Sequence, residues 1–325
     1  MDYEKILQDV MKYYNKKKPD IPDRVLDKDA NRIINIYKTT YQNILNYLVS
    51  ELSIQGDLSQ INHNTYMSMM AQIEYMLKSM EVEVRNEVTE VIEKEFIRGT
   101  VYHYAVINSV TDVTQILLDM PFSQINWNKA NQLIEDTMED LLYATSFTEQ
   151  SIKRLVKDVV SKHLQLGALE GEAYKNIKKR ITSELTAKGL SKTIKQKGFV
   201  GIIDKSGRRW NIITYTDMLV QTKMQQAYTE GLKEQSIQDG HDLAQIPYKS
   251  AKDSCKNFEG MIISMTGQTK GFYTYDQLKA TGLIFHPRCR HTPFPVYSMD
   301  TLHPDDIKDH EKKMTDLKKL GKNEK

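Results

Sequence analysis

Residues 65–92 read TYMSMMAQIEYMLKSMEVEVRNEVTEVI, and this stretch decides the fold of the chain. Its apolar side chains return at intervals of three and four residues, which is the spacing of one face of an α-helix. They are Met69, Met70, Ile73, Met76, Leu77, Met80, Val84, Val88 and Val91. Asn64 or Thr65 would cap the start of this helix, and Gly99 would stop or bend it. The many methionines favour adaptable core packing over a ligand-binding function.

The same spacing continues on both sides of this stretch. It predicts amphipathic helices over residues 32–52, 127–143, 148–166 and 173–185, with Gly167 ending the third of them. Few glycines or prolines interrupt the region. We therefore expect an elongated helical region, either a bundle or a subunit-spanning arm.

The pattern changes near Gly189. Two short β-type runs flank Gly207 within residues 199–213 and predict a β-hairpin. Residues 214–217 (TYTD) resemble a capping box and start a helix that ends near Asp239. Short strands are expected beyond Gly240, at residues 243–248, 261–264 and 283–285.

These patterns together predict an α+β fold that is mainly α. An elongated helical region over residues 1–187 precedes a small α+β domain over residues 188–300. Residues 301–325 mix lysines with acidic residues, so we expect a charged tail that is a solvated helix or a frayed end.

The composition limits the class of protein. Hydrophobic residues make up 40% of the 325 residues, enough for a buried core, and the net charge of +2 gives no global argument for nucleic-acid binding. No run reaches the roughly 18 apolar residues of a membrane span. Asp2 and Glu4 stand where a signal peptide would be basic. We expect a protein made in the cytoplasm, without a membrane partner.

The two cysteines, Cys255 and Cys289, exclude a disulfide framework but leave room for one bridge. Together with His286 and His291 they offer two thiolates and two imidazoles, which can complete a tetrahedral, structural zinc shell. Two other interpretations stay open, namely buried thiols beside hydrogen-bonding histidines and a Cys–His nucleophile pair. P-loop, GxGxxG, HExxH and GxSxG motifs are absent from the sequence. We therefore predict that the protein is not an enzyme and has no catalytic residues.

A basic segment precedes and includes the predicted hairpin. With Phe199 and Trp210 nearby, it predicts contact with DNA phosphates or an acidic protein surface. A solvated surface is the alternative, and no base-reading motif accompanies the charge. The candidate contact residues are Lys192, Lys195, Lys197, Lys205, Arg208 and Arg209.

Ordered motifs within residues 189–297 resemble those of phage minor capsid proteins of the minor capsid protein 2 type. The run GFVGIIDKSGRRW at residues 198–210 resembles the GF-x-D-x-x-GRRW segment of that family. The helix from Tyr215 to Gly231 resembles its Y-x-E-M-V-x-R-T and A-Y-x-x-G helix, and HPRCRH at residues 286–291 matches HPxCRH. The sequence departs from the family where Lys252 replaces a cysteine, Phe258 a tryptophan and Gln221 an arginine.

The family is related to the Mu F-like head morphogenesis proteins. The resemblance implies a low-copy structural component of the virion head, associated with the portal and acting in procapsid assembly. It implies the portal or major capsid protein as partner, and phage DNA as a further one. A DNA-binding accessory protein for packaging or ejection, and an effector enzyme carried in the virion, remain the alternative functions.

Overall fold

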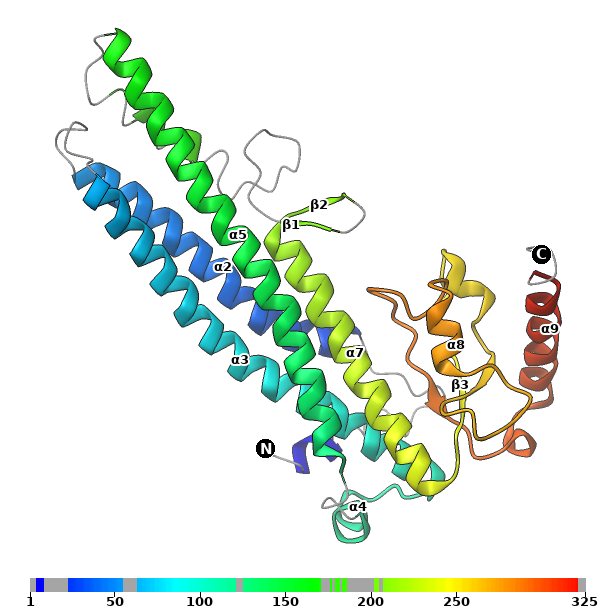
Figure 1. Cartoon of the computed structure of the whole chain (residues 1–325). Helices are drawn as coiled ribbons and strands as arrows, with labels where there is room; N and C mark the ends of the chain where they lie inside the picture. The colour runs from blue at the N-terminus through cyan, green and yellow to red at the C-terminus, as the bar shows by residue number, and fades with distance from the viewer. Residues whose placement is uncertain are drawn as a thin grey trace. The chain divides into compact units, whose positions relative to one another are not determined.

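The structure is a computed structural model, and it describes residues 4–8, 23–54, 63–120, 125–170, 176, 179–181, 183–185, 202–204 and 207–320. It is mainly helical, and the strands of the described residues all lie between Ile202 and Pro295, which confirms the predicted fold class (Figure 1). The helices are α2 (Asp23–Ile54), α3 (His63–Ile107), α4 (Val113–Asp119), α5 (Trp127–Glu170), α7 (Ile212–Asp239), α8 (Tyr275–Ala280) and α9 (Pro304–Leu320). The strands are β1 (Ile202–Ile203), β2 (Arg209–Trp210), β3 (Leu243–Gln245), β4 (Ile262–Ser264) and β5 (Phe294–Pro295).

The chain divides into two compact units. Unit 1 comprises Met1–Asp29, Thr89–Glu135 and Gln221–Lys325, and unit 2 comprises Ala30–Val88 and Asp136–Val220. Each of the four long helices, α2, α3, α5 and α7, therefore has residues in both units. The boundaries predicted from the sequence, after residues 187 and 300, stay a prediction.

Unit 2 contains the helical stripe that the sequence predicts up to Val88, and its last residue, Val91, belongs to unit 1. Within residues 69–91 every predicted core side chain is buried except Met76, which is half-buried. Tyr37 of α2 stacks on Tyr41 and hydrogen-bonds Thr145 of α5 through its hydroxyl at 3.2 Å. Buried apolar contacts of this kind supply most of the stability of long helices.

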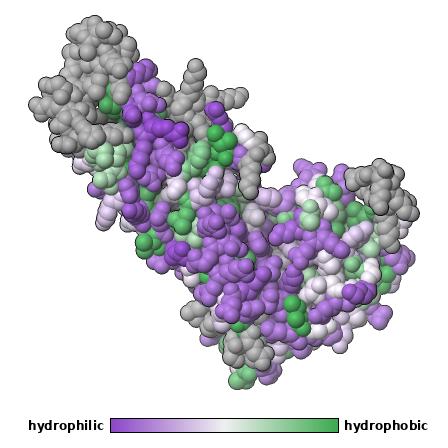
Figure 2. Space-filling model, in the orientation of Figure 1, coloured by the Kyte–Doolittle hydropathy of each residue, from purple (hydrophilic) through white to green (hydrophobic). Residues whose placement is uncertain are grey.

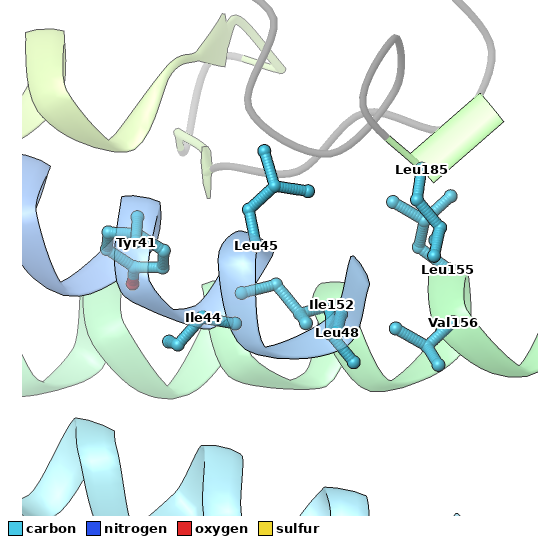
Figure 3. A pocket seen from close by; sticks show the side chains of 8 residues that line it. All are labelled: Tyr41, Ile44, Leu45, Leu48, Ile152, Leu155, Val156 and Leu185. Carbon is cyan, nitrogen blue, oxygen red and sulfur yellow. The ribbon is translucent and has the colours of Figure 1, made fainter. Parts of the chain in front are cut away.

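A small apolar pocket lies between α2 and α5 within unit 2. Figure 3 shows its side chains, which come from α2, α5 and the helical residue Leu185. Apart from the Tyr41 hydroxyl they carry no polar atom that would orient a ligand. We therefore regard this pocket as part of the core. The lining residues are Tyr41, Ile44, Leu45, Leu48, Ile152, Leu155, Val156 and Leu185.

Three predicted helix boundaries are wrong. Helix α3 continues through Gly99, and α5 is one helix across the predicted break near residue 145 and through Gly167. The hydroxyls of Thr145 and Thr148 donate to the carbonyls of Leu141 and Ala144, so these residues stay in the helix instead of ending it. Most of the helix predicted at residues 173–185 lies outside the described residues.

Gly99 allows α3 and α7 to approach closely within unit 1. A Cβ atom on Gly99 would lie 1.9 Å from the carbonyl oxygen of Tyr228, and one on Gly231 would lie 2.0 Å from that of Phe96. The Thr100 hydroxyl joins the two backbones, at 3.0 Å from the Phe96 oxygen and 3.2 Å from the Gly231 oxygen. The two glycines are therefore required by the helix crossing.

The C-terminal sheet has the order β4-β3-β5 and is antiparallel throughout, with Ala244 opposite both Ile263 and Pro295. The strand predicted at residues 283–285 is wrong, because these residues form a loop in which Phe285 has a φ of 56°. Its place in the sheet is taken by β5. Pro295 is tolerated there because β5 is an edge strand.

The predicted hairpin is confirmed, although its strands are short. Residues Ile202 and Ile203 pair with Trp210 and Arg209, and Gly207 adopts a φ of 77° in the turn. The Asp204 carboxylate accepts hydrogen bonds from Arg208 and from Trp210 Nε1 at 2.8 Å. The predicted second strand, residues 208–213, is cut short because α7 already begins at Ile212.

Residues 304–320 form helix α9, so the helical alternative predicted for the charged tail is confirmed, but the helix is not solvated on all sides. Its His310 is buried, and its Nδ1 atom accepts a hydrogen bond from the backbone N–H of Ile262 at 3.1 Å. The Tyr248 hydroxyl donates to Asp309, and Lys313 lies over the Tyr248 ring. One face of α9 therefore packs on the C-terminal sheet of unit 1.

Asp242 holds the loop after β4, and this contact makes the stability dependent on pH. Burial alone would raise its pKa, but donors from Ser264, Thr266 and Thr269 lower the pKa to about 2. A carboxylate with a lowered pKa contributes stability above its unfolded pKa of about 3.9, and this contribution is lost as the pH falls towards 2. The difference corresponds to about 2 kcal/mol.

We expect Asp242→Asn to lower the free energy of unfolding by about 2 kcal/mol at pH 7. Urea unfolding of both proteins between pH 7 and 2 should show the two stabilities converging below pH 4. Asp300→Asn, which neutralises an exposed carboxylate on the same unit, is the control and should stay within about 0.5 kcal/mol of the unsubstituted protein. A constant difference between Asp242→Asn and the unsubstituted protein at all pH values would contradict this role.

Candidate metal centre

Two segments of unit 1 carry the four predicted ligands, which fall into two groups that share Cys255. Cys255, Cys289 and His291 form one group and Asp253, Cys255 and His286 the other, with the ligand atoms of each group within 4.8 Å of one another. Cys255 lies on the short 3-10 helix η3 (Ser254–Asn257), whose first turn is capped by the Asp253 carboxylate. His286, Cys289 and His291 lie on the loop between α8 and β5. Within this loop the Cys289 N–H donates to the His286 carbonyl at 2.8 Å, which turns both side chains to one side.

Three of the distances between ligand atoms match those of a tetrahedral zinc site. The sulfur atoms of Cys255 and Cys289 are 3.7 Å apart, and each has a histidine nitrogen beside it. His286 Nε2 lies 3.2 Å from Cys255, and His291 Nδ1 lies 3.4 Å from Cys289. Bonds of 2.3 Å to sulfur and 2.0–2.1 Å to nitrogen give tetrahedral edges of about 3.8 Å and about 3.5 Å. Cys255, Cys289 and His291 therefore fit three positions of a tetrahedral shell, whereas His286 joins Cys255 in a separate group with Asp253.

Neighbouring acceptors orient both imidazole rings. His286 Nδ1 lies 2.9 Å from the Pro287 carbonyl, and His291 Nε2 lies 3.0 Å from the Glu259 carboxylate. Because these nitrogens donate, the nitrogen of each neutral ring that faces the sulfur atoms keeps its lone pair for a metal. Glu259 is fixed in turn by the backbone N–H groups of Lys249 and Ala251.

The ionisation of the cluster without a metal follows from the same contacts. Burial and the neighbouring Cys289 raise the pKa of Cys255. Burial also acts to raise the pKa of Cys289, but hydrogen bonds from His291 outweigh it and the pKa is lowered. Burial acts to lower the pKa of His291, and contacts with Cys289 and Glu259 raise it overall. Cys289 is therefore the thiol of the pair that ionises more readily, and the thiolate is the form that binds metal.

The structure argues against a disulfide and against an accessible nucleophile, whereas buried thiols beside hydrogen-bonding histidines also agree with these contacts. At 3.7 Å the sulfur atoms are not bonded, since a disulfide measures about 2.05 Å, and both cysteines are free. Cys289 contacts His291, and His291 contacts Glu259, as in a catalytic triad. However, Cys289 is only 4% exposed and His291 only 7% exposed. Cys255 is 1% exposed. A substrate could not reach either thiol without rearrangement.

The predicted basic contact residues are described only in part. Lys192, Lys195, Lys197 and Lys205 lie outside the described residues. Arg208 and Arg209 are exposed on the hairpin of unit 2, and Arg208 forms an ion pair with Asp204 at 2.8 Å and lies over the Trp210 ring. Part of the positive charge is therefore neutralised locally.

The sequence analysis missed the residues that support the metal ligands. Glu259 was visible only as the middle residue of the motif Phe258-Glu259-Gly260, where nothing in the sequence links it to His291. Asp253 could have been found as a capping residue two positions before Cys255.

Among the described residues, no helix is long and apolar enough to cross a membrane.

The sequence profile of one protein family, described as phage minor capsid protein 2, matches residues 21–324. No curated protein and no solved structure gives a significant match. The match covers the helical region as well as the C-terminal motifs, so it extends beyond the segment in which those motifs occur. The chain therefore belongs to the phage minor capsid protein 2 family, a family of structural capsid proteins, which places it in the virion.

Proposed function

We propose that this capsid protein acts in head morphogenesis near the portal, with the portal or the major capsid protein as its partner. Membership of the minor capsid family carries the proposal. A minor component needs a surface that recognises another subunit. The face in Figure 2 is largely hydrophilic with scattered hydrophobic side chains, so on this face such a surface is confined to small apolar groups.

Helix α3 offers one local surface of this kind in unit 2. Tyr75 and Val82 lie two turns apart on the same side of α3 and are 68% and 65% exposed. Tyr75 also lines a groove that includes Ile36 and Thr39 of α2. An exposed aromatic side chain beside a groove is a common anchor in protein interfaces.

The function is tested on phage heads. We expect purified procapsids and mature heads to contain a few copies of the chain. A chemical cross-linker should join these copies to portal subunits. Tyr75→Lys should lower its incorporation while leaving its thermal unfolding unchanged, whereas Asn131→Lys, at an exposed polar position of α5, should be incorporated normally. Absence of the chain from both kinds of head would overturn the proposal, and normal incorporation of Tyr75→Lys would remove α3 from the interface.

We also propose that Cys255, His286, Cys289 and His291 bind one structural zinc ion, because Cys255, Cys289 and His291 lie close together, His286 lies 3.2 Å from Cys255 and both rings are oriented by neighbouring acceptors. Protein purified without chelator should contain about one zinc per chain. His286→Ala should lower this content, and His303→Ala, at an exposed histidine, should not. If the purified protein contains no zinc, the four residues only hydrogen-bond one another and their neighbours.

DNA binding by the hairpin is the second candidate function, favoured by the exposed Arg208 and Arg209 beside Trp210. Such binding would be electrostatic and should fall steeply as salt rises. A filter-binding assay that detects no complex even at low salt would reject it. An effector enzyme gains no support from the described residues, because both cysteines are buried.

A further inference from the structure

Arg290 lies between two of the candidate ligands but contacts two helices. Its Nη2 atom lies 2.9 Å from Oδ1 of Asp27 on α2 and 3.0 Å from Oε1 of Gln221 on α7. Gln221 Nε2 donates to the same Asp27 oxygen at 3.2 Å. Each of the three side chains therefore contacts the other two within unit 1. Together they join residues 285–291, here called the ligand loop, to the start of α2 and to α7.

The backbone of the ligand loop is attached to α7 as well. The N–H of Arg288 donates to Oγ1 of Thr222 at 3.2 Å. Along residues 286–291 the contacts thus alternate, with His286, Cys289 and His291 facing the cluster and the intervening arginines joined to helices. Because these residues are neighbours in the chain, a shift of the candidate ligands would also move the backbone of the residues that contact the helices.

This loop adopts a conformation that it would not keep without support. Phe285 and Arg288 have φ values of 56° and 64°, in the left-handed region that side chains with a Cβ atom avoid. Residues held in this way persist where surrounding contacts fix them. Here the candidate ligands lie directly beside the two strained positions.

Resting on the proposed zinc site, we propose that the bound metal holds residues 285–291 in the conformation in which Arg290 ties α2 to α7. Metal binding and this helix attachment then stabilise each other, since coupling between two equilibria is reciprocal. Asp27 and Arg290 are each only partly buried, so the effect is graded.

Asp27→Asn tests the coupling without touching the ligand loop. It removes the negative charge that Arg290 faces on α2, while the four ligands remain. In a competition assay with a chromophoric chelator, we expect this variant to bind zinc about fivefold more weakly than the unsubstituted protein. Asp300→Asn removes the same charge from an exposed position and should bind zinc as the unsubstituted protein does.

The reverse effect is measured by hydrogen exchange on the full chain. Removing zinc should increase amide exchange in residues 23–30 of α2 and change residues 127–134 of α5 much less. Equal zinc affinity for Asp27→Asn and Asp300→Asn, or unchanged exchange at the start of α2, would overturn the coupling. A chain that binds no zinc at all would overturn the metal site itself, a distinct result because all three proteins would then behave alike.

Discussion

Gly231→Ala is expected to lower the free energy of unfolding by about 3 kcal/mol or more, the range of severe overpacking. The new methyl group would lie 2.0 Å from the carbonyl oxygen of Phe96, which belongs to the backbone of α3 and cannot rotate away. The helices must separate to accept it, and the bond from Thr100 to the Gly231 carbonyl would be lost. Urea unfolding followed by circular dichroism measures the difference.

The sign of this effect is informative, because helix propensity acts in the opposite direction. Alanine in place of glycine within a helix favours the helix by about 1 kcal/mol when nothing else changes. Ile237→Ala, at an exposed position of the same helix, is the matched control and should stay within about 0.5 kcal/mol of the unsubstituted protein. A Gly231→Ala variant that is more stable than this control would show that α3 and α7 do not cross as described.

Gly99→Ala adds an independent check of the crossing. Its methyl group would lie 1.9 Å from the carbonyl oxygen of Tyr228, at the same crossing of α3 and α7. Once the first substitution has separated the helices, the second meets less resistance. The double variant should therefore lose less stability than the sum of the two single losses, as is common for residues that share a contact. Strict additivity would mean that the two glycines act separately.

The helical part of the fold could be predicted because its signal is local. The apolar stripe at residues 69–91 repeats with the helical period, and burial follows that stripe closely. The role of Gly99 could not be predicted in the same way. Its function depends on Tyr228, more than a hundred residues later, and a lone glycine in a sequence reads equally well as a helix end.

The candidate site shows the same limit. The residue types and spacing of HPRCRH and Cys255 sufficed to name four candidate ligands, since thiolates and imidazoles are the preferred donors for zinc. Their partners could not be named, because Glu259 reaches His291 through the fold of unit 1. The strand predicted at residues 283–285 is wrong for a related reason, since this apolar run belongs to the loop that carries the candidate ligands and not to the sheet.

Removal of zinc is expected to lower the thermal midpoint of unfolding by roughly 10 °C. A ligand present at a thousand times its dissociation constant stabilises the folded state by about 4 kcal/mol. For a unit of this size each kcal/mol shifts the midpoint by about 2–4 °C. Calorimetry with and without a chelator measures the shift. It should affect the transition of unit 1, which contains the ligands, because unit 2 has none of them.

Glu259→Gln separates the metal from ordinary packing in this effect. The amide retains an oxygen that can accept from Lys249 and Ala251, but it loses the charge that raises the basicity of His291. A change of this kind beside a metal ligand costs about 10- to 100-fold in metal affinity. The midpoint of Glu259→Gln should therefore be low at limiting zinc and rise towards that of the unsubstituted protein as zinc is added. Glu311→Gln, at an exposed position of α9, should show no such dependence. If Glu259→Gln is equally destabilised with and without zinc, Glu259 acts only by holding the backbone of residues 249–251, and the zinc assignment loses its main support.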